Sequence, residues 1–110
     1  MKLIKAIVRP YKVEDVKNAL ARLDISGMTV TEVRGHGWQT GRTAVYRGQE
    51  YSVDLRPKME LEVVLADHMV DDAVRAIIGA ARTGQTGDGR VFVLPTAESY
   101  RIRTGDLDRE

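Results

Sequence analysis

Cysteine is absent from the 110-residue chain, and phenylalanine and tryptophan occur only once each. Without cysteine, disulfides, zinc ribbons and thiol catalysis are all excluded. The charges nearly cancel, at a formal net charge of +1, and no run of like charges stands out. The sequence therefore gives no support to binding of nucleic acid or of a membrane surface through bulk electrostatics.

The chain also lacks the features of export. Its first residues, Met1 to Lys5, read directly as a strand, without the longer apolar stretch and small-residue cleavage site of a signal peptide. No apolar run approaches the length needed to span a bilayer. We expect a cytoplasmic protein that reaches a membrane only by binding another protein.

Hydrophobic residues make up 43% of the chain and charged residues 30%, which is typical of a soluble globular domain, here one domain over residues 1–110. The spacing of apolar residues predicts, in order, strand 2–9, helix 11–23, strand 28–34, strand 59–65, helix 70–81, strand 90–94 and a short edge strand at 99–103. We expect Asp67 to cap the second helix and Gly84 to end it. The βαββαβ order predicts an α+β, ferredoxin-like fold, in which an antiparallel sheet carries both helices on one face.

The first strand is apolar on both sides. Leu3 and Ile7 alternate with Ile4, Ala6 and Val8, and Val91 to Leu94 shows the same property. Because the helices cover only one face of the sheet, an isolated monomer would expose the other apolar face, and we predict a homo-oligomer. The alternative is a monomer with scattered exposed apolar residues.

About twenty residues, Gly35 to Pro57, separate the second and third strands, whereas most connections in compact domains have about 4–6 residues. The segment is rich in glycine, aromatic residues and arginine, a composition that favours protein recognition over packing. Its aromatic residues and arginines are Trp38, Arg42, Tyr46, Arg47, Tyr51 and Arg56. The alternative is an ordinary hairpin with strands 44–46 and 51–53 around residues 47–50, and a hairpin tip can also dock on a partner.

A second glycine cluster, Thr83 to Arg90, joins a predicted helix to a strand. Its backbone amides could converge on phosphates, although it matches neither a Walker A loop nor a Rossmann fingerprint. The alternative is that Gly84 ends the helix and Asp88-Gly89 makes a tight turn. Arg101 and Arg103 alternate with Ile102 and would point to the same side of an extended segment, where they could grip phosphate or solvate an edge strand.

Taken together, the motifs resemble the PII nitrogen-regulatory signal proteins. The resemblance covers nearly the whole chain in unbroken order. The residues that carry it are Thr29-Val30-Thr31-Glu32-Val33-Arg34-Gly35, Tyr46-Arg47-Gly48, Glu50-Tyr51, Val53-Asp54, Pro57-Lys58, Ala81-Arg82-Thr83-Gly84, Gly87-Asp88-Gly89 and Arg101-Ile102-Arg103-Thr104-Gly105.

The resemblance implies a homotrimer of ferredoxin-like subunits that binds ATP or ADP in the clefts between neighbours. It divides the chain into a T-loop at 36–57, a phosphate-binding loop at 82–90 and a C-terminal loop at 101–110, with Arg101 and Arg103 reaching the phosphates from the adjacent subunit. By similarity, the nucleotide-binding residues would be Thr29, Gly35, Gly37, Trp38, Gln39, Glu62, Val64, Gly87, Asp88, Gly89, Arg90, Arg101 and Arg103.

The same resemblance implies that the protein senses 2-oxoglutarate and regulates targets of nitrogen assimilation through the conformation of the T-loop. The residues at the keto acid would be Gln39, Thr40, Gly41, Lys58 and Gly87. Gln39 would also contribute an oxygen to Mg²⁺, together with the ATP phosphates and the keto acid, and Lys58 would pair with a carboxylate. Tyr51 stands at a position that is modified in some members, and Arg47 where some members plug an ammonium channel. The expected protein targets are such a channel, or enzymes and regulators of nitrogen metabolism.

The chain departs from the family at several positions. Trp38 stands where Arg or Lys is usual, which removes a possible charge-assisted phosphate contact of about 1.5–3 kcal/mol. Arg90 replaces a usual Lys, so that the charge is kept and the geometry changes. Ala44, where Glu is common, and Arg42 alter the charge of the T-loop and with it the expected partner.

Three other classes of protein differ from this resemblance in features that the sequence can show. A relative that binds adenine nucleotide without sensing 2-oxoglutarate is compatible with Trp38. A CutA-like trimer should show soft or imidazole ligands, whereas this chain has no cysteine and only His36 and His68. An acylphosphatase-like enzyme would need a phosphate loop early in the chain, which Arg9-Pro10-Tyr11 does not offer. The function implied by the resemblance to PII proteins requires no catalytic nucleophile or base, and we predict that the chain is not an enzyme.

Overall fold

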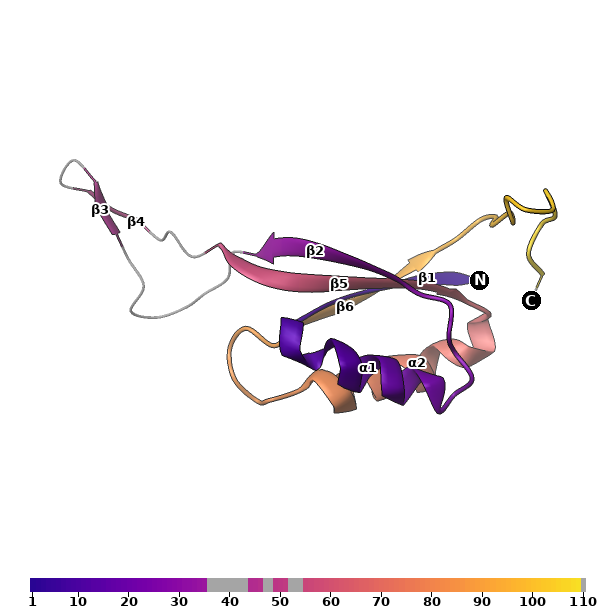
Figure 1. The fold of residues 1–110 in the computed structure, drawn as a ribbon, viewed down its shortest axis with the longest axis horizontal. Helices are drawn as coiled ribbons and strands as arrows, with labels where there is room; N and C mark the ends of the chain where they lie inside the picture. The colour runs from indigo at the N-terminus through magenta and orange to yellow at the C-terminus, as the bar shows by residue number, and fades with distance from the viewer. Residues whose placement is uncertain (36–43, 47–48, 52–54, 110) are drawn as a thin grey trace.

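A four-stranded antiparallel sheet carries two helices on one of its faces in the computed structural model of the chain (Figure 1). The structure describes residues 1–35, 44–46, 49–51 and 55–109. The strands lie in the order β2-β5-β1-β6, and a separate two-stranded sheet pairs β3 with β4. The elements of the main sheet and its helices are β1 (Lys2–Val8), α1 (Val13–Ala21), β2 (Thr29–Gly35), β5 (Arg56–Leu65), α2 (Val70–Ala81) and β6 (Gly89–Pro95). This is the predicted ferredoxin-like arrangement.

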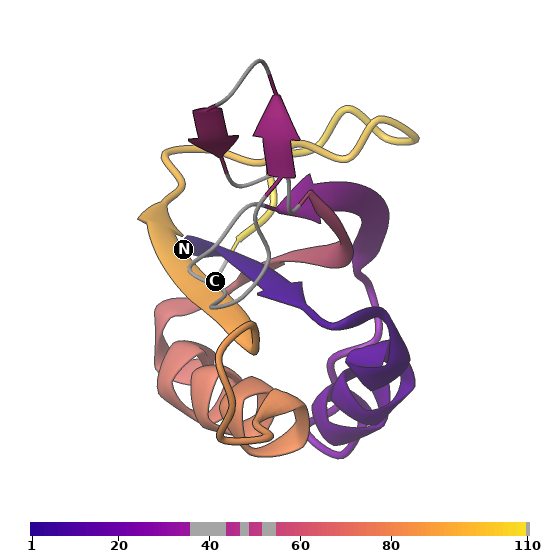
Figure 2. The ribbon, with the colours of Figure 1, turned by 90° about the vertical axis from the view of Figure 1, so that its left-hand side faces the viewer.

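The core lies between the helices and the central strands β1 and β5, with both helices on the same side (Figure 2). Alternate residues of β1 point toward the helices, and Ile4, Ala6 and Val8 are almost completely buried. Leu20 of α1 and Ile77 of α2 pack against them. These side chains have the strand period of two and the helical stripe that the sequence shows, so the local patterns alone account for this layer.

Within the described ranges, no helix covers the opposite face of the sheet. Lys5 of β1 pairs with Phe92 of β6, and Leu3 pairs with Leu94, so these side chains share the face away from the helices. Phe92 and Leu94 remain 42% and 39% exposed. The predicted apolar side chains on the second face are thus present, beside an ion pair between Lys5 and Glu60. The homo-oligomer that would cover this face stays a prediction.

Both caps predicted for the second helix are wrong. Asp67 lies in a short 3-10 turn, η2 (Asp67–Met69), and its carboxylate accepts hydrogen bonds from the Met1 amino group and from Lys2 Nζ instead of capping α2. Gly84 does not end the helix either, because Arg82 already has an extended backbone and Gly84 follows it in the loop. A second 3-10 turn, η1 (Pro10–Lys12), occupies the start of the predicted first helix.

The strand predicted at residues 59–65 is β5, which begins earlier, at Arg56, and runs through Pro57. Pro57 pairs with Arg34 of β2, and β1 ends at the Val8–Met59 pair. At Pro57 the strand therefore has a neighbour on one side only, which is the situation in which a sheet tolerates proline. The small hairpin is present as β3 (Ala44–Tyr46) and β4 (Gln49–Tyr51), and its second strand begins two residues before the predicted one.

The predicted edge strand at 99–103 is also wrong. Only an isolated bridge joins Tyr100 to Leu107, and the chain turns at 102–104. Gly105, at a φ of 75°, donates its N–H to the Arg101 carbonyl and closes the turn. Arg101 and Arg103 therefore do not alternate along an extended segment. None of the helices in the described part of the chain is long and apolar enough to cross a bilayer.

Neighbouring isoleucines on α2 test the position of the core. Ile77 is 2% exposed and Ile78 is 40% exposed. We expect Ile77→Ala to lower the free energy of unfolding by about 2–5 kcal/mol, because it leaves a cavity between helix and sheet. Ile78→Ala, with the same change of side chain, should cost about 1 kcal/mol or less. Urea unfolding at one fixed protein concentration measures both, and equal losses would contradict the orientation of α2.

Candidate functional site

The loop between α2 and β6 is closed around the carboxylate of Asp88. One oxygen, Oδ2, accepts hydrogen bonds from the backbone N–H groups of Thr83 at 2.8 Å and Gly84 at 2.9 Å. The other, Oδ1, accepts from the Thr83 hydroxyl and from Nε of Arg9 at 3.2 Å. Arg9 also donates from Nη2 to the Thr86 carbonyl at 2.9 Å, so that the end of β1 is tied to the loop at two points.

These contacts fix the charge state of Asp88. The Thr83 hydroxyl, followed by the Thr83 and Gly84 N–H groups and Arg9, holds the pKa of the Asp88 carboxyl well below its ordinary value, against a smaller effect of burial. Both oxygens of the ionised carboxylate accept hydrogen bonds from the loop or from Arg9. In this structure, Asp88 therefore shapes the loop and does not face outward to a ligand.

Glycine is required where the loop enters β6. Gly87 and Gly89 have φ values of 100° and 105°, in the region that favours glycine. A Cβ on Gly89 would lie 1.7 Å from the backbone oxygen of Ile7. Gly89 pairs with Val8 at this point, so the lack of a side chain lets β6 join the edge of β1.

Lys58 connects the open face of the sheet to this loop. It is 9% exposed, and its Nζ donates to the Gly87 carbonyl at 2.6 Å. Its Cγ lies 3.4 Å from the position of a Cβ on Gly35, the last residue of β2. Gly35, the last described residue before segment 36–57, therefore lies beside Lys58. The structure thus brings together Gly35, Lys58 and Gly87, three of the residues that the family resemblance assigns to the nucleotide or the keto acid.

A second group of predicted residues lies at the other end of the sheet. Thr29 pairs with Glu62, and both line a hollow with Leu3, Gly27, Met28 and Val64. Val64 also borders a hollow of about 340 Å³ that includes Arg101 and the first residue of the chain. Arg103 is exposed on the same C-terminal loop.

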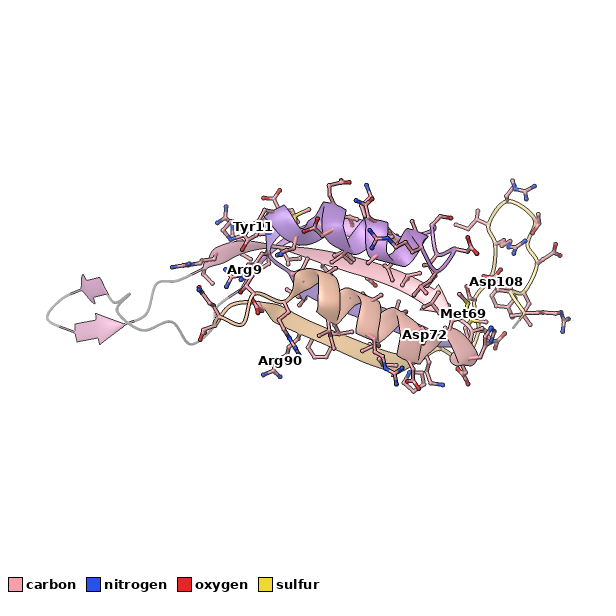
Figure 3. The ribbon with its side chains drawn as sticks, turned by 90° about the horizontal axis from the view of Figure 1, so that it is seen from below. Arg9, Tyr11, Met69, Asp72, Arg90 and Asp108 are labelled. Carbon is pink, nitrogen blue, oxygen red and sulfur yellow. The ribbon has the colours of Figure 1, made fainter. Side chains whose placement is uncertain are left out.

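The two groups are well separated within one chain. Gly89 pairs with Val8 of β1, whereas Val64 pairs with Leu3. Five residues along a strand correspond to about 17 Å. Figure 3 shows Arg9 and Arg90 near one end of the helices and Asp108, the ion-pair partner of Arg101, beyond their other end. A single chain therefore does not bring Arg101 to the loop at 82–90.

The remaining predicted site residues lie outside the described residues: Gly37, Trp38, Gln39, Thr40, Gly41 and Arg47. Tyr51 ends β4, where its backbone pairs with Ala44. Over the described ranges, no group of three or more His, Cys, Asp or Glu side chains is placed to hold a metal ion.

The sequence analysis missed Arg9 and Thr83, which hold Asp88 in place. The threonine had a local signal, since a Thr-Gly pair shortly before Asp-Gly is typical of a loop closed by side-chain hydrogen bonds to the backbone. Arg9 had none, because it lies 79 residues away from Asp88 in the chain. Only the pairing of β1 with β6 brings the two together.

Comparison with known proteins identifies relatives along the whole chain. The family model described as nitrogen regulatory protein P-II matches residues 1–106. The chain is 53% identical over 108 residues to a nitrogen regulatory protein P-II of Klebsiella oxytoca, covering 98% of this chain and 96% of that protein. It is 52% identical over 110 residues to the protein of the same name from Haemophilus influenzae, and 48% identical over 110 residues to that from Rhizobium etli, covering in each case 100% of this chain and 98% of the relative.

Two glycines of the loop test its geometry. Gly84 and Gly89 both have positive φ, but nothing lies within 4 Å of a Cβ on Gly84. Gly84→Ala should lower the free energy of unfolding by about 1–2 kcal/mol, the cost of the left-handed backbone alone. Gly89→Ala should cost clearly more, because the clash with Ile7 adds to the same backbone cost. Chemical denaturation of both variants is the measurement, and equal losses would show that β6 does not approach β1 as described.

The titration of Asp88 provides a test by pH. Because its pKa is lower in the folded protein, the contribution of the loop to stability is complete above about pH 4 and is lost as the pH falls through the folded value. In Thr83→Val, which keeps the N–H and loses the hydroxyl, we expect the pKa of Asp88 to rise toward its ordinary value. The NMR titration of the Asp88 carboxyl carbon measures the shift. Thr86→Val is the control, since the Thr86 side chain makes no hydrogen bond to Asp88; a similar shift there would refute the assignment.

Proposed function

Because the chain belongs to the nitrogen regulatory protein P-II family, we propose that it is a cytoplasmic signalling protein that senses ATP, ADP and 2-oxoglutarate. In this proposal the ligands set the conformation of the T-loop, residues 36–57, and the T-loop regulates protein targets of nitrogen assimilation. The family is named for regulation and not for catalysis, in agreement with the prediction that the chain is not an enzyme.

The proposal that the nucleotide binds between two subunits rests on one observation. The residues predicted to bind it lie in two groups at opposite ends of the sheet of a single chain. Arg101 lies beside Val64, about 17 Å along the strands from the loop at Gly87 to Arg90. If both the loop and Arg101 contact phosphate, Arg101 must come from a second copy of the chain. The open apolar face with Phe92 and Leu94 supports such an assembly, which we propose to be a homotrimer.

Within this arrangement, the nucleotide would lie along the open face of one subunit. Glu62 and Val64 would receive the base, and the loop Gly87 to Arg90 would receive the phosphates. The positive charges at the phosphates would be Arg90 of the same subunit and Arg101 and Arg103 of the neighbour. Asp88 would contribute by holding the loop in shape, as its four hydrogen bonds indicate.

The keto acid would lie beside the phosphates, next to Lys58. Lys58 already lies against Gly87 and Gly35, so its ammonium group is near both the phosphate loop and the start of the T-loop. Gln39, Thr40 and Gly41 are assigned to this site by the family resemblance. Mg²⁺, when bound, would supply a hard cation that joins the ATP phosphates to the oxygens of 2-oxoglutarate, with Gln39 as the protein ligand.

The output would be the pose of the T-loop. A bound keto acid at Gln39 and Lys58 would order one conformation, and ADP, which lacks the γ-phosphate, would leave another. Candidate targets are an ammonium channel, with Arg47 as the contact, and enzymes or regulators of nitrogen metabolism. Tyr51 is a candidate for covalent modification.

A titration of 2-oxoglutarate by calorimetry tests the proposal. We expect binding in the presence of Mg-ATP and at least tenfold weaker binding in the presence of Mg-ADP, because only ATP completes the metal site. Equal binding with both nucleotides would contradict the coupling. Nucleotide binding with no response to 2-oxoglutarate under any condition would favour the alternative suggested by Trp38, a regulator that senses adenine nucleotide alone.

A double variant tests the assignment of the arginines. Arg101→Ala/Arg103→Ala should weaken ATP binding at least tenfold, since each charge-assisted hydrogen bond is worth about 1.5–3 kcal/mol. Arg22→Ala/Arg75→Ala is the matched control, because it removes two exposed arginines from the helices, away from the proposed site. Sedimentation of each variant reports whether the oligomer persists, and unchanged ATP affinity in the double variant would remove the two arginines from the site.

A further inference from the structure

The C-terminal segment 99–108 is closed on itself by its backbone. The N–H of Asp108 donates to the Ser99 carbonyl at 2.7 Å, and that of Arg101 donates to the Asp106 carbonyl at 2.9 Å. The turn between them is completed by Gly105 at positive φ. The base of the loop is thus fixed, while Ile102 at its tip is fully exposed.

Asp108 joins the two sides of this base with its side chain. Its Oδ2 accepts a hydrogen bond from the Ser99 hydroxyl at 2.8 Å, and its Oδ1 forms an ion pair with Nε of Arg101 at 2.9 Å. The side chain of Asp108 is 30% exposed, and that of Arg101 is 67% exposed. The carboxylate is therefore held by Ser99 and by the loop backbone, and it in turn holds a guanidinium that is otherwise largely in solvent.

We propose that Asp108 is a positioning residue that orients Arg101 for a phosphate group; this inference rests on the nucleotide binding proposed above. A carboxylate bound at Nε leaves the outer edge of the guanidinium, with Nη1 and Nη2, available for bidentate contact with phosphate oxygens. The long arginine side chain then loses less conformational entropy on binding, because part of its ordering is already present in the free protein.

The same carboxylate has an opposing effect. It is a negative charge near the place where phosphate would bind, so its removal should favour any anion, by an amount that is small in water and screened by salt. A variant of Asp108 therefore has to be compared with one that removes an equal charge from the same loop. Asp106 provides it, since its carboxylate makes no hydrogen bond or ion pair within the described part of the chain.

The experiment compares the ATP affinities of Asp108→Asn, Asp106→Asn and Ser99→Ala in the full chain. We expect Asp108→Asn to bind ATP about two- to tenfold more weakly than Asp106→Asn, which corresponds to the ordering of one long side chain. Ser99→Ala removes one of the contacts that hold Asp108 and keeps its ion pair with Arg101, so it should weaken ATP binding less than Asp108→Asn. If Asp108→Asn binds as tightly as Asp106→Asn or more tightly, or if Ser99→Ala weakens binding as much as Asp108→Asn, the positioning role is refuted.

Arg101→Ala separates this inference from the proposed function. If Asp108 acts through Arg101, then adding Asp108→Asn to Arg101→Ala should have no more effect on ATP affinity than adding Asp106→Asn. An extra loss in the Arg101→Ala background would show that Asp108 acts in another way.

If Arg101→Ala alone leaves ATP affinity unchanged, the proposed nucleotide site fails, and the positioning role fails with it. A weakened Arg101→Ala with an unaffected Asp108→Asn rejects only the positioning role. Far-UV circular dichroism and thermal unfolding of each variant confirm that the fold is retained.

Discussion

The apolar character of β1 on both of its sides is the constraint on which the rest of the structure depends. Ile4, Ala6 and Val8 face the helices and form the centre of the core. Leu3 and Ile7 face the other way, where the described part of the chain places no helix over them. A sheet with helices on one face only must expose its second face or share it, and exposed contiguous apolar surface is typical of an interaction site. The candidate site lies on this same face, so in the proposed trimer the surface that drives assembly also borders the ligand.

Hydrogen bonds to Asp88 hold the loop before β6, both from within the loop and from the residue that follows β1. Thr83 and Gly84 bind Asp88 from within the loop, and Arg9 binds it from the end of the central strand. Because these hydrogen bonds form one network around a single carboxylate, they fix the shape of the loop within one chain. In the proposed site, a loop of fixed shape would lose little entropy when phosphate binds. The contact of Gly87 with Lys58 places the loop near Gly35, the residue before segment 36–57. Lys58 thus connects the proposed phosphate site to Gly35.

The sequence predicted the features that depend on local patterns. The alternation in β1 and β5 and the apolar stripe of α2 were sufficient for the four-stranded sheet with both helices on one face. The errors concern long-range partners and turns. Asp67 looked like a helix cap, but Met1 and Lys2, more than sixty residues away, take up its carboxylate. The stretch 99–103 alternates like a strand over only five residues, and hydrogen bonds between Arg101, Gly105 and Asp106 turn it back. Periodicity gave no reason to place Lys58 beside Gly35 and Gly87, which lie far from it in the chain, whereas the family resemblance assigns all three to neighbouring ligand sites.

The separation of the two groups of site residues has a consequence for energetics. In the proposed arrangement, the phosphates contact Arg90 of one subunit and Arg101 of another, so each bound nucleotide joins two copies of the chain. A ligand that binds the assembled form and not the separate subunits stabilises the assembly by mass action, in proportion to the logarithm of its concentration over its dissociation constant. The assembly also has its own source of stability, in the apolar face around Phe92 and Leu94. Because that source does not depend on ligand, exchange of ATP for ADP can change the T-loop while the subunits stay together, as a reversible signal requires.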